Sequence, residues 1–512
     1  MNIQTNGKSP KFSSDDGTAI KQQTNESERL DKSRNEGKIG GNIFSLASGE
    51  IIARGIAFFG TAYAARQLGP EQFGIVGFAA ALFGFLSIAV SGGLNDIGSR
   101  EVARRPREAS SIAANVISIR LIIALAALIA VIFTAWFLDK PPTVKLVLLS
   151  MGLLFFSLAL DASWVYKGLE RNRPVAFALI ISQVFYTGVV FLAVNEPDDV
   201  VFVPLAQFTG EICAALMLAV PLFRLGKVEL NLREGWNILR GSSFWAISRL
   251  SRTLIYTFDI VLIGFLLGEQ AVGLYTAPYR ICFLLLAVAG AMYTSYLPVI
   301  TRAFNSDSPL LEVGKTAESS VNFAVTVAAP LVVGGIIIST PLLEAVFGRE
   351  YAEGSAAFRF LILSIGLVFL HGAMHNIFLA VNRLKTEMVI FGVAAAVNIG
   401  LNIFIIPRYG IVGAAFVTAT AEAVTLVAGL VVVNRIGVPF SLRHVWRPLL
   451  ASAVMGAALL ALGANHSLVL YLTVGGIVYL SALVLFRGVP QEARPFLKTT
   501  ASFVNNLRGN FK

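Results

Sequence analysis

The chain has few of the residues that soluble proteins and enzymes depend on. Only 14% of its 512 residues are charged, whereas a soluble globular domain carries about 25%. Its two cysteines, Cys213 and Cys282, lie within apolar stretches, which indicates small core residues rather than a disulfide or metal site. It has no Gly-rich phosphate loop with its Lys, and no motif that resembles a nucleophile elbow or a catalytic site with paired carboxylates. The sequence therefore argues against ATP hydrolysis and against an enzyme, and we expect no cofactor and no metal.

What the chain has instead is apolar sequence, which makes up 55% of its residues. Apolar runs recur from Ile43 to Phe486 with short polar breaks. Many are about 20 residues long, which at about 1.5 Å per residue matches a hydrocarbon core of about 30 Å. This pattern predicts an all-α polytopic membrane protein. The expected spans are 43–65, 74–95, 111–137, 144–166, 174–195, 201–223, 244–267, 273–298, 320–347, 356–380, 387–406, 411–433, 448–463 and 468–486.

The first 40 residues differ from the rest. They are rich in Lys, Ser, Asn, Asp and Gly and have almost no large apolar side chains, so we expect a disordered tail. No short apolar segment with a small-residue cleavage site follows the charges, which argues against a signal peptide.

Lys and Arg are distributed unevenly between the two sides of the predicted bundle. If the amino terminus is cytoplasmic, 30 of the 41 Lys and Arg residues fall in cytoplasmic segments, five on the other side and six within spans. Such a bias predicts that both termini are cytoplasmic, and we expect the inner membrane of a bacterium. It also explains the net charge of +10 without a nucleic acid partner. The outer loops do not exceed about ten residues, so function is expected within the bundle.

The two halves of the chain resemble each other at a nearly constant separation. Because each copy holds six spans, both begin on the same side, and the repeat is parallel. Transporters built from such repeats bind their substrate between the halves near mid-membrane. We expect a tail (1–40), an N-terminal lobe with six spans (41–240), a C-terminal lobe with six spans (241–440), and two added spans with a cytoplasmic tail (441–512). The matching residues are Leu68, Gly69 and Gly74 with Leu267, Gly268 and Gly273; Arg171 with Arg383; and Glu211, Arg224 and Gly226 with Glu422, Arg435 and Gly437.

Ionisable residues within spans are costly to insert, by about 2.5–3.5 kcal/mol each, and normally face a partner or a wet cavity. The first span carries Glu50 and Arg54 on one face. The seventh span, its repeat mate, carries Arg249, Arg252, Tyr256 and Asp259, which we also place on one face. Arg252 lies roughly 12 Å from the start of its span, which is deep for a side chain that must reach the interface.

These residues predict a cationic cavity between the lobes, open to the cytoplasm, because the planar guanidinium of Arg suits phosphate. Arg120 and Arg280 are further candidates for its lining. The alternative is that the charges pair, Glu50 with Arg54 and Arg252 with Asp259, and join helices together. For Glu211 and Glu422 a structural role is favoured, and Arg359 is expected to reach the outer interface.

Several other polar residues are candidates for gating or coupling. Asn95, Asp96 and Arg100 end the second span at the cytoplasmic edge, where they could gate the cavity or simply cap a helix. Asp161 lies in the fourth span. His371 and His375, four residues apart in the tenth span, could relay a proton, but packed histidines are the plainer interpretation.

Four short motifs occur in order along the chain. They are residues 65–74 (ARQLGPEQFG), residues 259–264 (DIVLIG), residues 272–277 (VGLYTA), and the stretch 398–413 with Asn402, Pro407, Tyr409 and Gly410. Together they resemble one family, the polysaccharide or oligosaccharide repeat-unit flippases of the multidrug/oligosaccharidyl-lipid/polysaccharide exporter superfamily. The resemblance covers roughly residues 40 to 440, and it implies two six-helix lobes around a central cavity and a cargo of oligosaccharide linked to polyprenyl pyrophosphate.

The expected partners are therefore the lipid-linked oligosaccharide and the membrane lipids, with a polysaccharide polymerase and a chain-length regulator as further candidates. The expected function is to carry repeat units across the inner membrane for exopolysaccharide or O-antigen synthesis. A cation-coupled exporter of small drugs is the main alternative, although that branch usually has an acidic cavity. A glycan polymerase or ligase, or a purely structural membrane partner, fits less well, because the large outer loop is missing and the buried charges are many.

Overall fold

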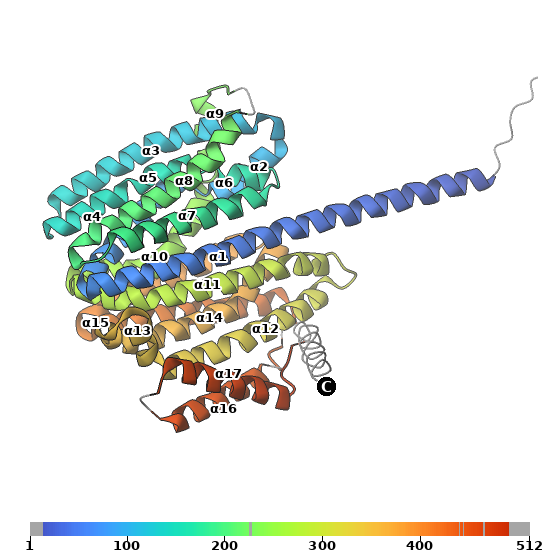
Figure 1. Cartoon of the computed structure of the whole chain (residues 1–512). Coiled ribbons are helices and arrows are strands. Elements are labelled where there is room, and N and C mark those ends of the chain that lie inside the picture. The colour runs from blue at the N-terminus through green and yellow to red at the C-terminus, as the bar shows by residue number, and fades with distance from the viewer. Residues whose placement is uncertain (1–13, 225–227, 440, 444, 464–465, 491–512) are drawn as a thin grey trace, which may run out of the picture.

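A computed structural model describes residues 14–224, 228–439, 441–443, 445–463 and 466–490 of the chain (Figure 1). Every regular element in these ranges is a helix. The first half contains α1 (Ser14–Ser91), α2 (Leu94–Arg104), η1 (Pro106–Glu108), α3 (Ala109–Phe137), α4 (Pro142–Gly152), α5 (Leu154–Leu160), α6 (Ser163–Gly168), α7 (Asn172–Ala193), η2 (Pro197–Val201), α8 (Phe202–Arg224) and α9 (Leu232–Gly241). The second half contains α10 (Ser243–Leu266), α11 (Glu269–Phe304), α12 (Pro309–Ile337), α13 (Ser339–Phe347), η3 (Arg349–Gly354), α14 (Ser355–Ala380), α15 (Leu384–Ile436), α16 (Trp446–Leu462) and α17 (Leu468–Leu485).

Two of these helices each contain two of the predicted spans. α1 is broken at Gly69 (φ 69°, ψ 173°), which is followed by Pro70. α15 is broken at Gly410 (φ 60°, ψ −145°). Both breaks have a positive φ, which glycine adopts without steric cost. Each break falls between two predicted spans, so the chain reverses there almost without a loop.

The predicted membrane helices are present. Among the described residues, ten helical segments are long and apolar enough to cross a membrane. Two of the ten, Ser48–Ser91 and Leu384–Ile436, hold the paired spans. The remaining two predicted spans correspond to α10, which carries Arg249, Arg252 and Asp259, and to the shorter α16. The chain is therefore an all-helical, multi-pass membrane protein.

The helices of each half pack mainly on one another. In the first half, α7 packs on α1 and α8, while α5 packs on α3 and α8; in the second, α14 and α10 both pack on α15, and α12 packs on α14. α1 also packs along α11 and α10, which joins the halves. In Figure 1 the helices α3 to α8 lie on one side of α1, and α11, α12 and α14 lie on the other. α16 and α17 pack on each other and attach to α12 at the far edge, outside the repeat.

The amino-terminal segment differs from expectation. α1 begins at Ser14 and continues into the bundle, so residues 14–40 are helical rather than irregular, and Figure 1 shows this part projecting from the bundle. A lone helix needs no apolar core, and the Lys, Glu, Gln and Arg residues here are good helix formers. Residues 1–13 lie outside the described part of the chain.

Candidate functional site

A cavity of about 670 Å³ lies between α1 and α10 and extends to α14 and α15. Arg54 of α1 and Arg249, Arg252 and Tyr256 of α10 line it together. A smaller cavity of about 150 Å³ adjoins it, shares Arg54 and Phe283 with it, and is lined by Arg280 of α11. The structure thus brings together five of the residues that were predicted to line the cavity, from three helices of both halves.

The cavity carries more positive than negative charge. Arg54 pairs with Glu50 at 2.7 Å, and both side chains are about half exposed. Arg252 lies 4.0 Å from Glu387 and 4.4 Å from the centre of the Phe391 ring. Four arginines, Arg249 and Arg280 included, therefore face only two carboxylates in the described structure, and the space between them suits an anionic group.

Glu387 is a cavity residue that the sequence analysis missed. It pairs with Arg252, for which the sequence had suggested Asp259 as the partner. It also lies 2.6 Å from Nδ1 of His375. It is in the first turn of α15, where an acidic residue also stabilises the helix dipole. Because it falls at the boundary of a predicted span, hydropathy gave no reason to select it.

Asp259 does not line the cavity, which corrects the prediction. Its side chain is fully buried and accepts hydrogen bonds from Tyr275 at 2.5 Å and from Thr418 at 3.1 Å. At about 100° per residue, Asp259 lies within about 20° of Arg252 around the helix, but it is seven residues, about 10 Å, further along α10. At that depth it faces Tyr275 of α11 and Thr418 of α15, inside the second half.

Arg120 is also removed from the cavity. It is 2% exposed, and its guanidinium donates to the carbonyl oxygens of Val90, Asp161 and Leu158. It thereby ties α3 to the end of α1 and to the loop after α5. The Asp161 carboxylate caps the next helix by accepting from the backbone N–H and hydroxyl of Ser163. Both residues stabilise the first half from within.

The two histidines lie in different surroundings. His375 lines the cavity beside Glu387, whereas His371 is buried and lies 2.8 Å from Glu422. Glu211 accepts hydrogen bonds from Ser157 and Gln207. No group of three metal-ligating His, Cys, Asp or Glu side chains occurs in the described ranges. The histidines and acidic residues thus form polar pairs between helices, and a coupling role for them stays a prediction.

The predicted gate and interface residues can be placed only in part. Asn95 and Asp96 belong to the first turn of α2, but their side chains lie outside the described structure. Arg100 is exposed on α2. Arg359 is exposed and donates to the Ser339 hydroxyl at 3.0 Å.

The two halves meet tightly at the end of the bundle opposite α2 and α9. There the repeat-related Gly74 and Gly273 face each other: a β-carbon at Gly74 would lie 1.8 Å from the Glu269 carbonyl oxygen, and one at Gly273 would lie 1.8 Å from that of Pro70. Only glycine permits two backbones to approach this closely. The seam between the halves is therefore closed at this end.

Polar contacts reinforce the closed seam. Lys140, after α3, forms an ion pair of 2.8 Å with Glu269 of α11 and donates to the Gly264 carbonyl at 2.7 Å. Both charged side chains of the pair are mostly buried. Tyr351 donates to the Ala65 carbonyl at 2.8 Å. Every one of these contacts joins the first half of the chain to the second.

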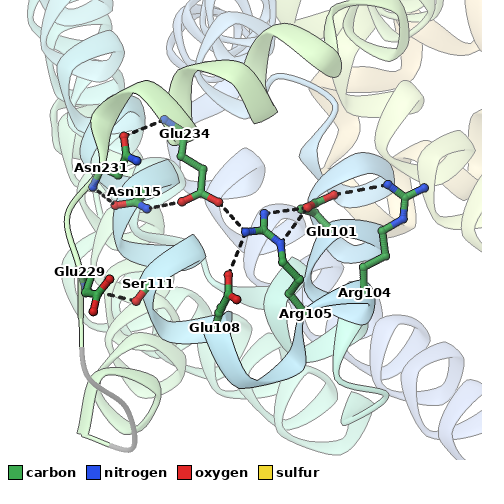
Figure 2. A network of polar contacts seen from close by, with 9 residues as sticks. All are labelled: Glu101, Arg104, Arg105, Glu108, Ser111, Asn115, Glu229, Asn231 and Glu234. Atoms are coloured by element: carbon green, nitrogen blue, oxygen red, sulfur yellow. Dashed lines mark hydrogen bonds and ion pairs between the residues drawn. The ribbon is translucent and has the colours of Figure 1, made fainter.

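A polar network holds α9 at the other end of the bundle (Figure 2). Arg105 lies at its centre and pairs with Glu101, Glu108 and Glu234 at 2.7–2.8 Å. Glu234 also accepts from Asn115 of α3 at 3.0 Å. Hydrogen bonds to Glu234 and then to Glu101 raise the pKa of Arg105 above its ordinary value. The network fixes α9 on α3, near the start of α2, where Gly93 lines the cavity.

Two helical halves, a seam closed at one end and a charged cavity towards the other are the features of an alternating-access membrane transporter. Solved structures have the same fold. The lipid II flippase MurJ in an inward closed conformation matches with a TM-score of 0.73, covering 86% of this chain and 98% of that one at 16% identity. An inward-facing multidrug resistance MATE transporter matches with a TM-score of 0.62, covering 75% and 95% at 16% identity.

The sequence pattern of the polysaccharide biosynthesis protein family matches residues 39–304, just over half of the chain. The chain belongs to this family. A MatE pattern matches residues 245–404. A probable low-salt glycan biosynthesis flippase of Haloferax volcanii is 22% identical, over 86% of this chain and 95% of that protein. A putative O-antigen transporter of Shigella dysenteriae is 24% identical, over 57% of this chain and 73% of that protein.

Proposed function

We propose that this protein is a flippase that carries oligosaccharide repeat units, linked to a polyprenyl pyrophosphate, across the inner membrane for surface polysaccharide synthesis. Its relatives are named as a glycan biosynthesis flippase and as O-antigen transporters. The observation that carries the proposal for the cargo is the arginine-lined cavity between the two halves. A pyrophosphate is an anion that several guanidinium groups can bind at once.

The cavity lies on the side from which the cargo must enter. Gly93, Leu384 and Glu387 line it, and all three belong to helix ends on the side where Lys and Arg gather. We place that side, and both termini, in the cytoplasm, following the bias of positive charge. With the opposite seam closed, the structure has the arrangement of an inward-facing state that receives a lipid-linked sugar from the inner leaflet.

Transport then requires the cavity end of the bundle to close and the seam at the opposite end to open. Binding of pyrophosphate by Arg54 of the first half, and by Arg249, Arg252 and Arg280 of the second half, would draw the halves together around the cargo. The seam at Gly74 and Gly273 would separate at the same time, as alternating access requires. Glu387, freed from Arg252 by the anion, would stay paired with His375.

The residues that the structure describes form no outer domain that could join the delivered units. We therefore propose that it acts as a transporter beside a separate polysaccharide polymerase and chain-length regulator, and that it performs no glycan chemistry itself. The short outer connections, such as η2 and the breaks at Gly69 and Gly410, leave no room for a catalytic domain there.

An exporter of small drugs is the second candidate, because a MatE pattern matches part of the second half. The charge of the cavity argues against it. Cationic drugs require an acidic lining, whereas four arginines face two carboxylates here. Drug susceptibility of a deletion strain tests this alternative directly: increased sensitivity to cationic drugs with intact surface polysaccharide would favour the exporter.

The flippase proposal can be tested by reconstituting the purified chain in liposomes and following a lipid-linked oligosaccharide from one leaflet to the other. Loss of a charge-assisted contact costs about 1.5–3 kcal/mol, so Arg54→Ala and Arg252→Ala should each slow flipping about tenfold or more. Arg359→Ala serves as the matched control, because Arg359 is also an arginine in a span but binds Ser339 outside the cavity. Normal flipping by both cavity variants would refute the role assigned to the arginines.

A further inference from the structure

An apolar groove of about 500 Å³ lies next to the cationic cavity, on the other side of the break between α1 and α2. Its sides are α1, α3 and the start of α10, and α9 covers it. Arg240 is its charged residue, among linings that are otherwise apolar or glycine. Its apolar lining includes Ile88, Ala89, Ile123, Trp236 and Leu250.

The groove and the cavity share a thin partition. Gly92 lines the groove and Gly93 lines the cavity, and these two residues form the break between α1 and α2. On α10, Leu250 faces the groove while Arg249 faces the cavity. Both glycines have a positive φ, 57° and 68°, which side-chain-bearing residues rarely adopt. The partition at this point is the backbone of Gly92 and Gly93, with the side chains of Leu239 and Ser242 packed against Gly92.

The exposed residues of α9, which covers the groove, are of the types found at the depth of the lipid headgroups. α9 is held on α3 by Gly235, where a β-carbon would lie 2.3 Å from the Asn115 carbonyl oxygen, and by the network of Figure 2. Its other side exposes Leu232 and Trp236, by 48% and 52%, followed by exposed Arg240. Trp and Arg together are typical of a membrane interface, where an aromatic ring borders the hydrocarbon and a cation meets phosphate.

We propose that this groove binds the polyprenyl chain of the cargo next to its pyrophosphate, while the pyrophosphate itself lies in the cavity on the other side of the Gly92–Gly93 partition. The inference rests on the proposed function. It gives the hydrocarbon a defined exit from the interlobe cavity, between α1 and α10, into the inner leaflet. The hydrocarbon would pass beside the partition, between these two helices, so that both ends of the lipid stay bound.

The charge pattern favours the cargo over an ordinary phospholipid as the occupant. A phospholipid in the groove would place its phosphate beside Arg240 alone. A polyprenyl pyrophosphate can place its first isoprene units in the groove and its two phosphates among the cavity arginines, so that both sites act in one molecule. Linked sites of this kind bind more tightly than either does alone.

The test measures equilibrium binding of two probes, undecaprenyl pyrophosphate and inorganic pyrophosphate, to the full-length protein in phosphatidylcholine nanodiscs. Ala89→Trp fills the groove from α1. It should weaken undecaprenyl pyrophosphate at least about tenfold, the effect of excluding two or more methylene groups, and should leave inorganic pyrophosphate unchanged. Arg252→Ala should weaken both probes. The control is Ala126→Trp, at an exposed alanine of α3 that is outside the groove, and it should change neither.

The outcomes separate the groove from the general function. Equal undecaprenyl pyrophosphate affinity in wild type and Ala89→Trp, with both probes bound, would overturn the groove assignment and leave the flippase proposal standing. If phosphatidylglycerol competed with undecaprenyl pyrophosphate for the wild type, and Ala89→Trp abolished this competition, the groove would be assigned to a phospholipid instead. If neither probe bound the wild type, the proposed function itself would fail. If Ala89→Trp lost both probes, Ile123→Trp on the opposite wall decides: selective loss of the long-chain probe supports the groove, and unchanged binding of both rejects it.

Discussion

The closed seam at Gly74 offers the sharpest prediction, because a single methyl group should open it. A β-carbon at Gly74 would lie 1.8 Å from the Glu269 carbonyl oxygen and 2.8 Å from the Gly273 nitrogen. Carbon and oxygen atoms pack at about 3.5 Å, so the two backbones must separate by about 1.5 Å or more. Both contacts are backbone, which cannot rotate away as a side chain can.

The cost of Gly74→Ala falls on the conformation in which the two glycines meet, which we propose to be the inward-facing one. Overpacking a close-packed contact typically costs about 1–3 kcal/mol. If the opposite state separates these helices, the ratio of the two states should shift by about 5- to 150-fold towards the outward-facing one. Flipping should slow, because the cargo can bind only when the cavity faces inward.

Accessibility of Thr276 measures this shift. Thr276 is 4% exposed and lies on α11 near the seam. With Cys213 and Cys282 replaced by Ala, a Thr276→Cys reporter should react slowly with a membrane-impermeant maleimide. Adding Gly74→Ala should speed that labelling by about 5- to 150-fold.

A second glycine of the same helix provides the control. A β-carbon at Gly84 meets nothing within 4 Å, so Gly84→Ala should leave both the labelling rate and transport unchanged. Labelling of Gly74→Ala as slow as that of the parent, with normal flipping, would refute the claim that this contact closes the outer seam.

Two further predictions concern the ion pairs at the two ends of the bundle. Lys140→Glu should open the outer seam by placing two carboxylates together, and adding Glu269→Lys should restore slow Thr276→Cys labelling, because the pair then forms with its charges exchanged. Arg105→Gln should lower the thermal unfolding temperature, and by the same amount at pH 6 and pH 9. The pKa of Arg105 is raised above its ordinary value, which already lies well above pH 9. Its contribution to stability is therefore complete below the ordinary pKa and is lost only as the pH rises through the higher folded pKa.

Each of these has an outcome that contradicts it. Failure of the double exchange to restore slow labelling would mean that Lys140 and Glu269 do not act on each other in the membrane. A destabilisation by Arg105→Gln that disappeared at pH 9 would show that Arg105 loses its proton there, against the effect assigned to Glu234 and Glu101.

The sequence alone determined the number and order of the membrane helices. Hydropathy over about 20 residues is a local property, and burial in lipid imposes it on each span separately. It also predicted that Arg54 and Arg252 would face one cavity, because they occupy corresponding helices of a repeat. Span positions held even where two spans proved to be one kinked helix, as at Gly69 and Gly410.

Only the tertiary structure decided which charges face the cavity and which face inward. Asp259 and Arg120 were plausible lining residues by spacing, but whether a side chain faces the cavity depends on which distant helices pack against it. The same packing brought Glu387 beside Arg252, set Gly74 against Gly273, and placed α9 over an apolar groove. Such contacts join residues more than a hundred positions apart, and no local pattern of hydropathy or charge encodes them.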